Sequence, residues 1–191
     1  MQERPDLDVN EWQKAINSTK TFSSPGIDGF TFAELKQIPK KLLSELVQVV
    51  AQMEAFPEWL WLSKTIPLPE VQNNPLRSQS RPITVLSSIY RIWSKITARG
   101  ILRHLASQLP PEITGLLPGR GAFQAAYHQQ VFLEKARLEM QTLTGLTLDL
   151  KKCVNLIGRD QVQILMQKHG LNPQLIDKWA NSLKVLCRYW L

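Results

Sequence analysis

Cysteine is scarce in this chain of 191 residues, which contains only Cys153 and Cys187. Two cysteines are too few for a disulfide framework or for the usual four-ligand zinc site. The three histidines, His104, His128 and His169, are far apart and lack the short spacings of metal ligands, so we expect them at the surface or in the core. From the cysteine content we expect a reducing, intracellular compartment, either the cytoplasm or the nucleus.

Long hydrophobic runs are also missing. The apolar stretches are interrupted by Gln, Lys or Pro well short of the roughly 18 residues that a transmembrane helix needs. The N-terminal sequence MQERPDLD carries acids and none of the apolar segment of a signal peptide. We therefore expect no membrane partner. With 43% hydrophobic and 20% charged residues, the chain has the composition of one globular domain with a real core.

Acidic residues are sparse in the middle of the chain. Residues 64–120 contain two acids and eight bases, which gives this segment a charge of +6 within a total of +7. Six of these bases are arginines, whose guanidinium groups bind phosphates through paired hydrogen bonds. This concentration of charge favours a polyanionic partner, although a solvated surface rich in bases would give the same count.

The first part of the chain is predicted to be helical. Apolar periodicity predicts helices over residues 9–19, 31–38 and 40–55, and the last two meet at Pro39, because the residue before a proline disfavours helix. Residues 64–69 include two prolines, so we expect an extended segment that can form only an edge strand.

Strands and helices alternate in the remainder, which makes the predicted fold class α+β. We expect a β-rich segment over 81–86, helices over 87–108 and 122–140, a strand over 146–150, and helices over 159–169 and 173–189.

Asp149 is the candidate metal ligand. In a strand over 146–150, Leu146, Leu148 and Leu150 share one face, and Thr147 and Asp149 share the other. A carboxylate at the end of an apolar strand, followed by two lysines, suits a divalent cation beside bound phosphates. An exposed turn aspartate at a strand end is the alternative.

Four bases repeat at every fourth position of the predicted helix over 87–108. Arg91, Lys95, Arg99 and Arg103, here called the ridge, wind slowly along one side of that helix. The ridge borders the apolar stripe instead of opposing it, which suits the wall of a nucleic-acid groove. Long side chains lying over the edge of the core would give the same pattern.

A glycine-rich loop over 115–121 precedes the predicted helix over 122–140 and contains Arg120. Glycines let backbone amides approach an anion, and the N-terminus of a helix attracts one. We therefore add Arg120 to the ridge as a candidate nucleic-acid contact, although such loops are common before helices.

Five segments occur in an order that resembles one known family. They are SPGIDGF at 24–30, IPLP at 66–69, RPITVLSSIYRIWSKITARGI at 81–101, GLLPGRGAFQAA at 115–126 and LTLDLKKCVN at 146–155. In this order they resemble the reverse transcriptase domain of non-LTR, LINE-type retrotransposons. The resemblance covers nearly the whole chain.

The resemblance implies a partial right-hand polymerase, with fingers over residues 1–140 and the start of the palm over 141–191. It implies that Asp149 binds catalytic magnesium and that Arg81 lies over the triphosphate of the incoming dNTP. It places Val154 against the sugar, although Val154 could also be an ordinary buried residue. The implied partners are an RNA template and a DNA primer.

The chain departs from the family in three ways. The Tyr-x-Asp-Asp element is absent and no Asp-Asp pair occurs anywhere, Val154 stands where the family has an aromatic residue, and Asn155 stands where many members have an aspartate. We therefore expect a reverse transcriptase region that is catalytic only if a further palm segment completes it. A nucleic-acid-binding module without catalysis and a retrotransposon relic are the alternatives.

Overall fold

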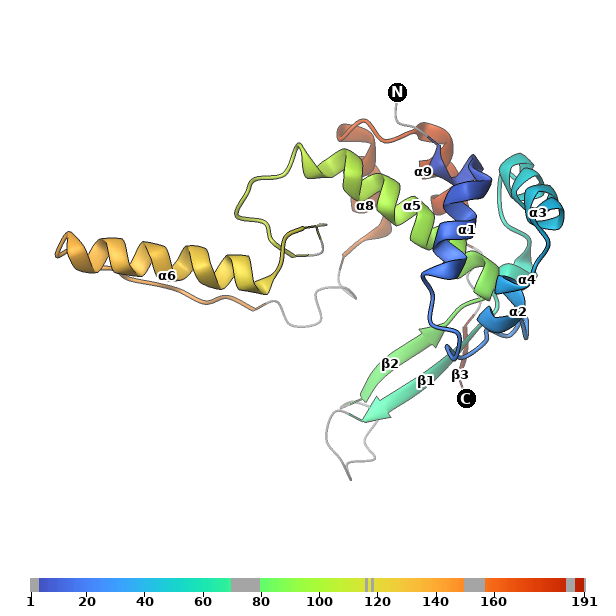
Figure 1. The fold of residues 1–191 in the computed structure, drawn as a ribbon, viewed down its shortest axis with the longest axis horizontal. Helices are drawn as coiled ribbons and strands as arrows, with labels where there is room; N and C mark the ends of the chain where they lie inside the picture. Colours follow the sequence, from blue (N-terminus) through green and yellow to red (C-terminus); the bar gives the residue numbers. More distant parts are fainter. Residues whose placement is uncertain are drawn as a thin grey trace.

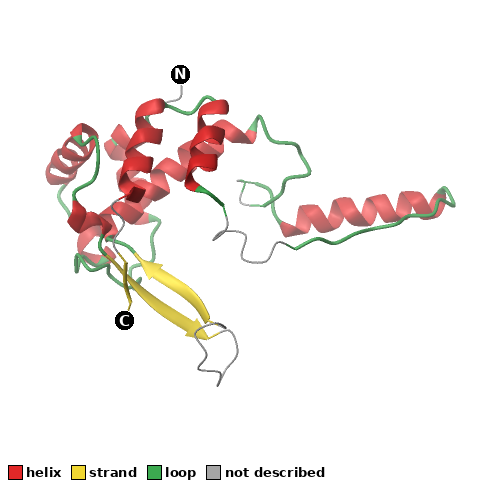
Figure 2. Cartoon of the chain, turned by 180° about the vertical axis from the view of Figure 1, so that it is seen from behind, coloured by secondary structure: helices red, strands yellow, loops and turns green. Residues whose placement is uncertain are grey.

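The computed structural model describes residues 4–69, 80–115, 117, 119–149, 157–184 and 188–190. Most of its elements are helices, and three short strands form a small sheet at one side (Figures 1 and 2). The described helices are η1 (Pro5–Leu7), α1 (Val9–Asn17), α2 (Phe32–Lys36), α3 (Lys40–Gln52), α4 (Glu58–Trp61), α5 (Ser88–Ala106), α6 (Ala122–Leu138), α8 (Arg159–Lys168) and α9 (Pro173–Lys184). The strands are β1 (Ser63–Pro69), β2 (Ser80–Val85) and β3 (Arg188–Trp190).

The helix starts follow local capping chemistry. The Asp8 carboxylate accepts a hydrogen bond from the Asn10 amide at 2.8 Å and caps α1. Thr31 and Glu34 form a reciprocal capping box at the start of α2, in which each side chain accepts from the backbone amide of the other. Pro39 lies directly before α3, as the sequence predicts. These helices are therefore confirmed, with small changes at their ends.

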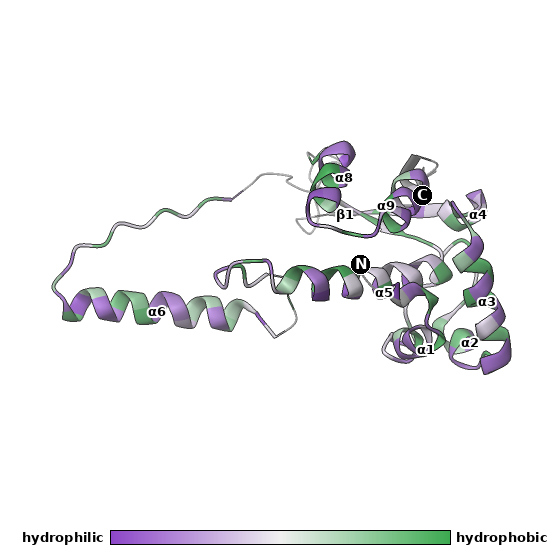
Figure 3. Ribbon diagram, turned by 90° about the horizontal axis from the view of Figure 1, so that it is seen from above, coloured by the Kyte–Doolittle hydropathy of each residue, from purple (hydrophilic) through white to green (hydrophobic). Residues whose placement is uncertain are grey.

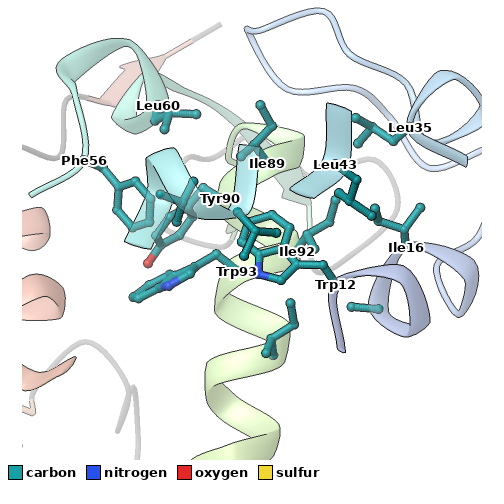
Figure 4. Close-up of a cluster of buried hydrophobic side chains, with 14 of the residues drawn as sticks. Trp12, Ile16, Leu35, Leu43, Phe56, Leu60, Ile89, Tyr90, Ile92 and Trp93 are labelled. Carbon is teal, nitrogen blue, oxygen red and sulfur yellow. The ribbon is translucent and has the colours of Figure 1, made fainter. Parts of the chain in front are cut away.

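The core is built around α5 and is rich in aromatic side chains (Figure 4). Trp12, Trp61 and Trp93 are completely buried, and Phe56 and Tyr90 pack among them with edge-on or tilted rings. The indole N–H groups of two of these tryptophans donate to backbone carbonyls, at 2.8 Å and 3.0 Å. The apolar rings are therefore buried without leaving these polar atoms unsatisfied.

A buried lysine joins α9 to this core. Lys178 is 3% exposed, donates to the backbone carbonyl of Val50 and lies 4.7 Å from the centre of the Phe56 ring. Burial lowers its pKa to about 8, against the opposing effect of the Asp6 carboxylate. Asp6 is held in turn by Arg4 at 2.9 Å. These side chains connect the N-terminal segment, α3 and α9, although burial makes the charged form of Lys178 unfavourable.

The sheet has the strand order β2-β1-β3. β1 pairs antiparallel with β2 and parallel with β3, so the prediction that it forms an edge strand is wrong. Its two prolines are tolerated because β3 pairs only with residues 63–65, and Pro67 and Pro69 lie beyond that ladder. The helix predicted over 173–189 is also wrong in its last part, since residues 188–190 pair with β1.

Helix α6 projects away from the helical body, and residues 141–149 run back toward the body as an extended chain that stands apart from the helix in Figure 3 (Figures 1 and 3). The predicted strand over 146–150 is wrong for the described residues 146–149, which pair with no strand. Leu146 and Leu148 are more than three-quarters exposed. Alternation of apolar residues gives a strand only where another strand completes its hydrogen bonds, and no described strand lies beside this segment.

Candidate nucleic-acid interface

The ridge faces α1, which lies across α5 (Figure 1). Arg91 donates from Nη1 to the backbone carbonyl of Ser24 at 2.9 Å, and its guanidinium lies 4.9 Å from the centre of the Phe32 ring. Lys95 donates to the Thr19 hydroxyl at 3.1 Å. Both cations are therefore held against the loop that follows α1.

The next two members of the ridge contact opposite ends of α1. Arg99 donates from Nη2 to the Ser18 hydroxyl at 3.3 Å. Arg103, the most exposed member, lies 3.7 Å from a carboxylate oxygen of Glu11 in α1. Cations beside the last turn of α1 are favourable, because the unpaired carbonyls of a helix C-terminus carry partial negative charge.

Most of the ridge charge is not neutralised within the described part of the chain. Arg91, Lys95 and Arg99 donate to carbonyl and hydroxyl oxygens, which carry no formal charge. Burial lowers the pKa of Lys95, and the positive charge of Arg99 lowers it further. Hydrogen bonds to neutral groups position these side chains without cancelling their field, so the ridge keeps its attraction for anions.

Lys36 joins the ridge at the loop over residues 18–24, here called the α1 loop. It belongs to α2, and its amine donates to the Thr21 hydroxyl at 2.8 Å. Spacing within the sequence does not reveal this contact, because α2 follows the loop and the ridge lies more than fifty residues later. Cations from two helices therefore converge on the α1 loop.

The SPGIDGF segment fastens the α1 loop to the start of α5. The Asp28 carboxylate accepts from the Ser88 amide at 2.8 Å, and the Ser88 hydroxyl donates to the carbonyl of Phe30 at 2.6 Å. Gly26 is pressed against the backbone before α5, where a Cβ would lie 2.6 Å from the carbonyl oxygen of Leu86. The contacts show a positioning role for this segment.

A pocket of about 300 Å³ lies between the α1 loop, β2 and α5. It is lined by Ser23, Ser24, Ile83, Thr84, Val85 and Arg91. Arg81 belongs to the strand that forms one wall, and its backbone is paired opposite Leu68. The side chain of Arg81 lies outside the described atoms, so its role toward dNTP stays a prediction.

The structure does not bring Arg120 to the ridge contacts. Its guanidinium donates to the carbonyl oxygens of Pro110 and Ile113, at 2.8 Å and 3.0 Å, and so closes the loop that follows α5. These two hydrogen bonds give Arg120 a local structural role in the loop. Nucleic-acid binding by Arg120 stays a prediction.

Asp149 is exposed at the end of the extended segment 141–149. Within the described residues, no three His, Cys, Asp or Glu side chains gather closely enough to hold a metal ion. The described carboxylates therefore do not by themselves form a magnesium site, and metal binding by Asp149 stays a prediction. Val154 lies outside the described residues.

Two histidines that are distant in sequence meet between α5 and α8. His104 Nε2 lies 2.9 Å from the backbone carbonyl of His169, and Gln108 contacts both rings, at 3.2 Å and 3.0 Å. No spacing in the sequence predicts this contact. The network anchors the end of α8 to α5 and shows no metal-ligand geometry.

No helix in the described part of the chain combines the length and apolar character needed to cross a membrane. No protein-family model matches the chain. Curated relatives nevertheless align over most of its length, and all of them come from transposable elements.

The first of these relatives is the retrovirus-related Pol polyprotein of the type-2 retrotransposable element R2DM of Drosophila melanogaster. It is 21% identical over 174 residues, which cover 91% of this chain and 16% of the relative. The uncharacterized 149 kDa protein of transposon TX1 of Xenopus laevis is 24% identical over 175 residues, with 89% and 13% covered. The probable RNA-directed DNA polymerase of transposon BS of Drosophila melanogaster is 23% identical over 159 residues, with 80% and 17% covered.

The chain thus spans between 13% and 17% of the length of these relatives. Their names agree with the resemblance carried by the five sequence segments. The matches support a region related to the reverse transcriptases of retrotransposons.

Proposed function

We propose that this chain is the fingers region and the start of the palm of a reverse transcriptase, and that its ridge binds the nucleic-acid template. The observation that carries the proposal is the row of ridge cations on α5, which meet mostly neutral oxygens and keep their charge. The kinship with retrotransposon polymerases supports an RNA strand as the polyanion. Primer and dNTP binding follow from the same kinship, with Arg81 and Val154 as the dNTP contacts.

A nucleic-acid-binding module without catalysis is the second candidate. It is favoured by the absence, among the described residues, of any group of three or more His, Cys, Asp or Glu side chains that could hold a metal ion. Both candidates predict strand binding by the ridge, and they differ in nucleotide addition. Binding is therefore the property to test first.

The test measures binding of single-stranded RNA to the purified chain over a range of salt concentrations. Each phosphate contact contributes roughly −0.7 to the slope of log affinity against log salt for single strands. Replacing all four ridge residues by glutamine should flatten this slope by about 2 to 3 units. Glutamine keeps hydrogen-bonding capacity, and the melting temperature should stay near that of the wild-type chain.

A matched control removes the same charge elsewhere. Lys40, Lys41, Arg137 and Lys168 are exposed and lie outside the ridge, so their glutamine variant should leave the slope nearly unchanged. If both quadruple variants flatten the slope equally, the ridge is not the binding surface.

A further inference from the structure

Phe22 lies in the α1 loop and is 100% exposed. Ile27 and Phe30, in the SPGIDGF segment that follows, are also partly exposed, at 42% and 45%. Burial of a phenylalanine side chain contributes about 1.5–3 kcal/mol to folding, and Phe22 contributes none of this. Single exposed apolar side chains are common on protein surfaces, so exposure alone indicates nothing about a ligand.

Phe22 differs from an ordinary exposed apolar residue because three cations are attached close to it along the chain. Lys20 precedes it by two residues and is exposed. The amine of Lys36 is bound to Thr21, and the guanidinium of Arg91 is bound to Ser24. These three cations, here called the basic collar, are thus attached within two residues of Phe22 along the chain.

Among the described residues, no ion pair joins the basic collar to an acid. The sequence contains no Asp or Glu between Glu11 and Asp28. One carboxylate oxygen of Asp28 is bound to the Ser88 amide, and the other is buried. These contacts do not cancel the charge of Asp28, but the three cations of the basic collar outnumber it, so the α1 loop presents an aromatic ring beside a net positive charge.

We propose that Phe22 is a stacking platform for an unpaired base of the strand that the ridge binds. The inference rests on the proposed function, because it places the ligand on the same surface. Proteins that bind single strands combine a positive track for the phosphates with aromatic rings for the bases, and each stacked base contributes about 1–3 kcal/mol. Here the ridge supplies the track, and the α1 loop supplies the ring at the end of it.

A small pocket lies next to the α1 loop and includes Arg91 of the basic collar in its lining. Its volume is about 300 Å³, and Ser23, Ser24 and Thr84 are among the residues that line it. A partner protein with an apolar face would suit this surface less well, because Lys36 and Arg91 are bound within two residues of the single ring. An anionic membrane would also attract these cations and could accept an inserted phenylalanine. A membrane needs a broad basic face, however, and the ridge is a narrow line of cations along α5.

The experiment compares Phe22→Ala and Phe22→Trp with the wild-type chain, using a labelled single-stranded RNA of about 16 nucleotides. Phe22→Ala should weaken binding about five- to hundredfold at every salt concentration, with an unchanged salt slope because no charge is lost. Phe22→Trp should bind at least as tightly as wild type. Melting temperatures should be equal, since the Phe22 ring is fully exposed.

Two controls separate stacking from other effects. Phe132→Ala removes another exposed phenylalanine, from α6, and should leave binding unchanged. Duplex RNA of the same length should respond much less to Phe22→Ala, because its bases are already stacked. Equal losses for single-stranded and duplex RNA would overturn the stacking role.

The outcomes also separate this inference from the proposed function. If the ridge variant flattens the salt slope while Phe22→Ala binds RNA like wild type, the inference fails and the proposed function stands. If neither variant changes RNA binding, both fail. If Phe22→Ala instead weakens binding to vesicles of anionic phospholipid and leaves RNA binding intact, the ring serves a membrane and the inference is overturned.

Discussion

Replacing Gly26 by alanine should destabilise the fold strongly, because the added methyl group has nowhere to go. Its Cβ would lie 2.6 Å from the carbonyl oxygen of Leu86, 2.7 Å from the Cα of Ser87 and 2.8 Å from Oδ1 of Asp28. Ordinary contacts of a Cβ atom begin at 3.4 Å. Two of these neighbours are backbone atoms just before α5, so they cannot turn aside as a side chain can. The SPGIDGF segment and α5 must therefore separate by almost 1 Å, the difference between 2.6 Å and 3.4 Å.

The cost has two parts. Overpacking of this kind costs about 1–3 kcal/mol, and loosening the hydrogen bond from the Ser88 amide to the Asp28 carboxylate costs about 1.5–3 kcal/mol. Since the chain relaxes in part, we expect the free energy of unfolding to fall by about 3 kcal/mol. With a urea dependence of about 2 kcal/mol per molar, the unfolding midpoint should fall by about 1.5 M.

The assay is urea unfolding followed by far-ultraviolet circular dichroism. Gly145→Ala is the matched control, because nothing lies within 4 Å of a Cβ built at Gly145. That variant should stay within about 0.5 kcal/mol of wild type. A Gly26→Ala midpoint equal to those of wild type and control would refute the close packing of the SPGIDGF segment against α5.

Two further predictions concern catalysis and pH. The purified 191-residue chain should not extend a primer, because the Tyr-x-Asp-Asp element is absent from the sequence and single members of a catalytic unit rarely act alone. Incorporation of dNTPs by this chain that is lost in Asp149→Ala would contradict the prediction. The pKa of Lys178 is lowered to about 8 from an ordinary value of 10.5, so above pH 8 the unfolded chain holds a proton that the folded chain releases. The free energy of unfolding should therefore rise between pH 8 and pH 9.5, by about 1 kcal/mol per pH unit, and this rise should be lost in Lys178→Met. If the urea midpoints of the two proteins change in parallel with pH, the titration of Lys178 does not control stability.

The sequence by itself determined the features that depend on neighbours along the chain. Helix α5 and the four-residue spacing of the ridge follow from periodicity, and Pro39 and Pro173 mark the starts of α3 and α9. Local backbone sterics and apolar periodicity act over a few residues, so they can be read without the fold. The five segments that resemble reverse transcriptases are likewise a property of the sequence alone.

Only the tertiary structure decided which residues meet across long distances. It placed β3 beside β1, buried Lys178 against Val50 and brought Lys36 and the ridge to the α1 loop. It also showed that the segment ending at Asp149 pairs with no described strand. Strand pairing, burial and the convergence of charges depend on contacts between distant segments, and these form only when the whole chain packs. For this reason the spacing of the ridge could be predicted, whereas the basic collar around Phe22 could not.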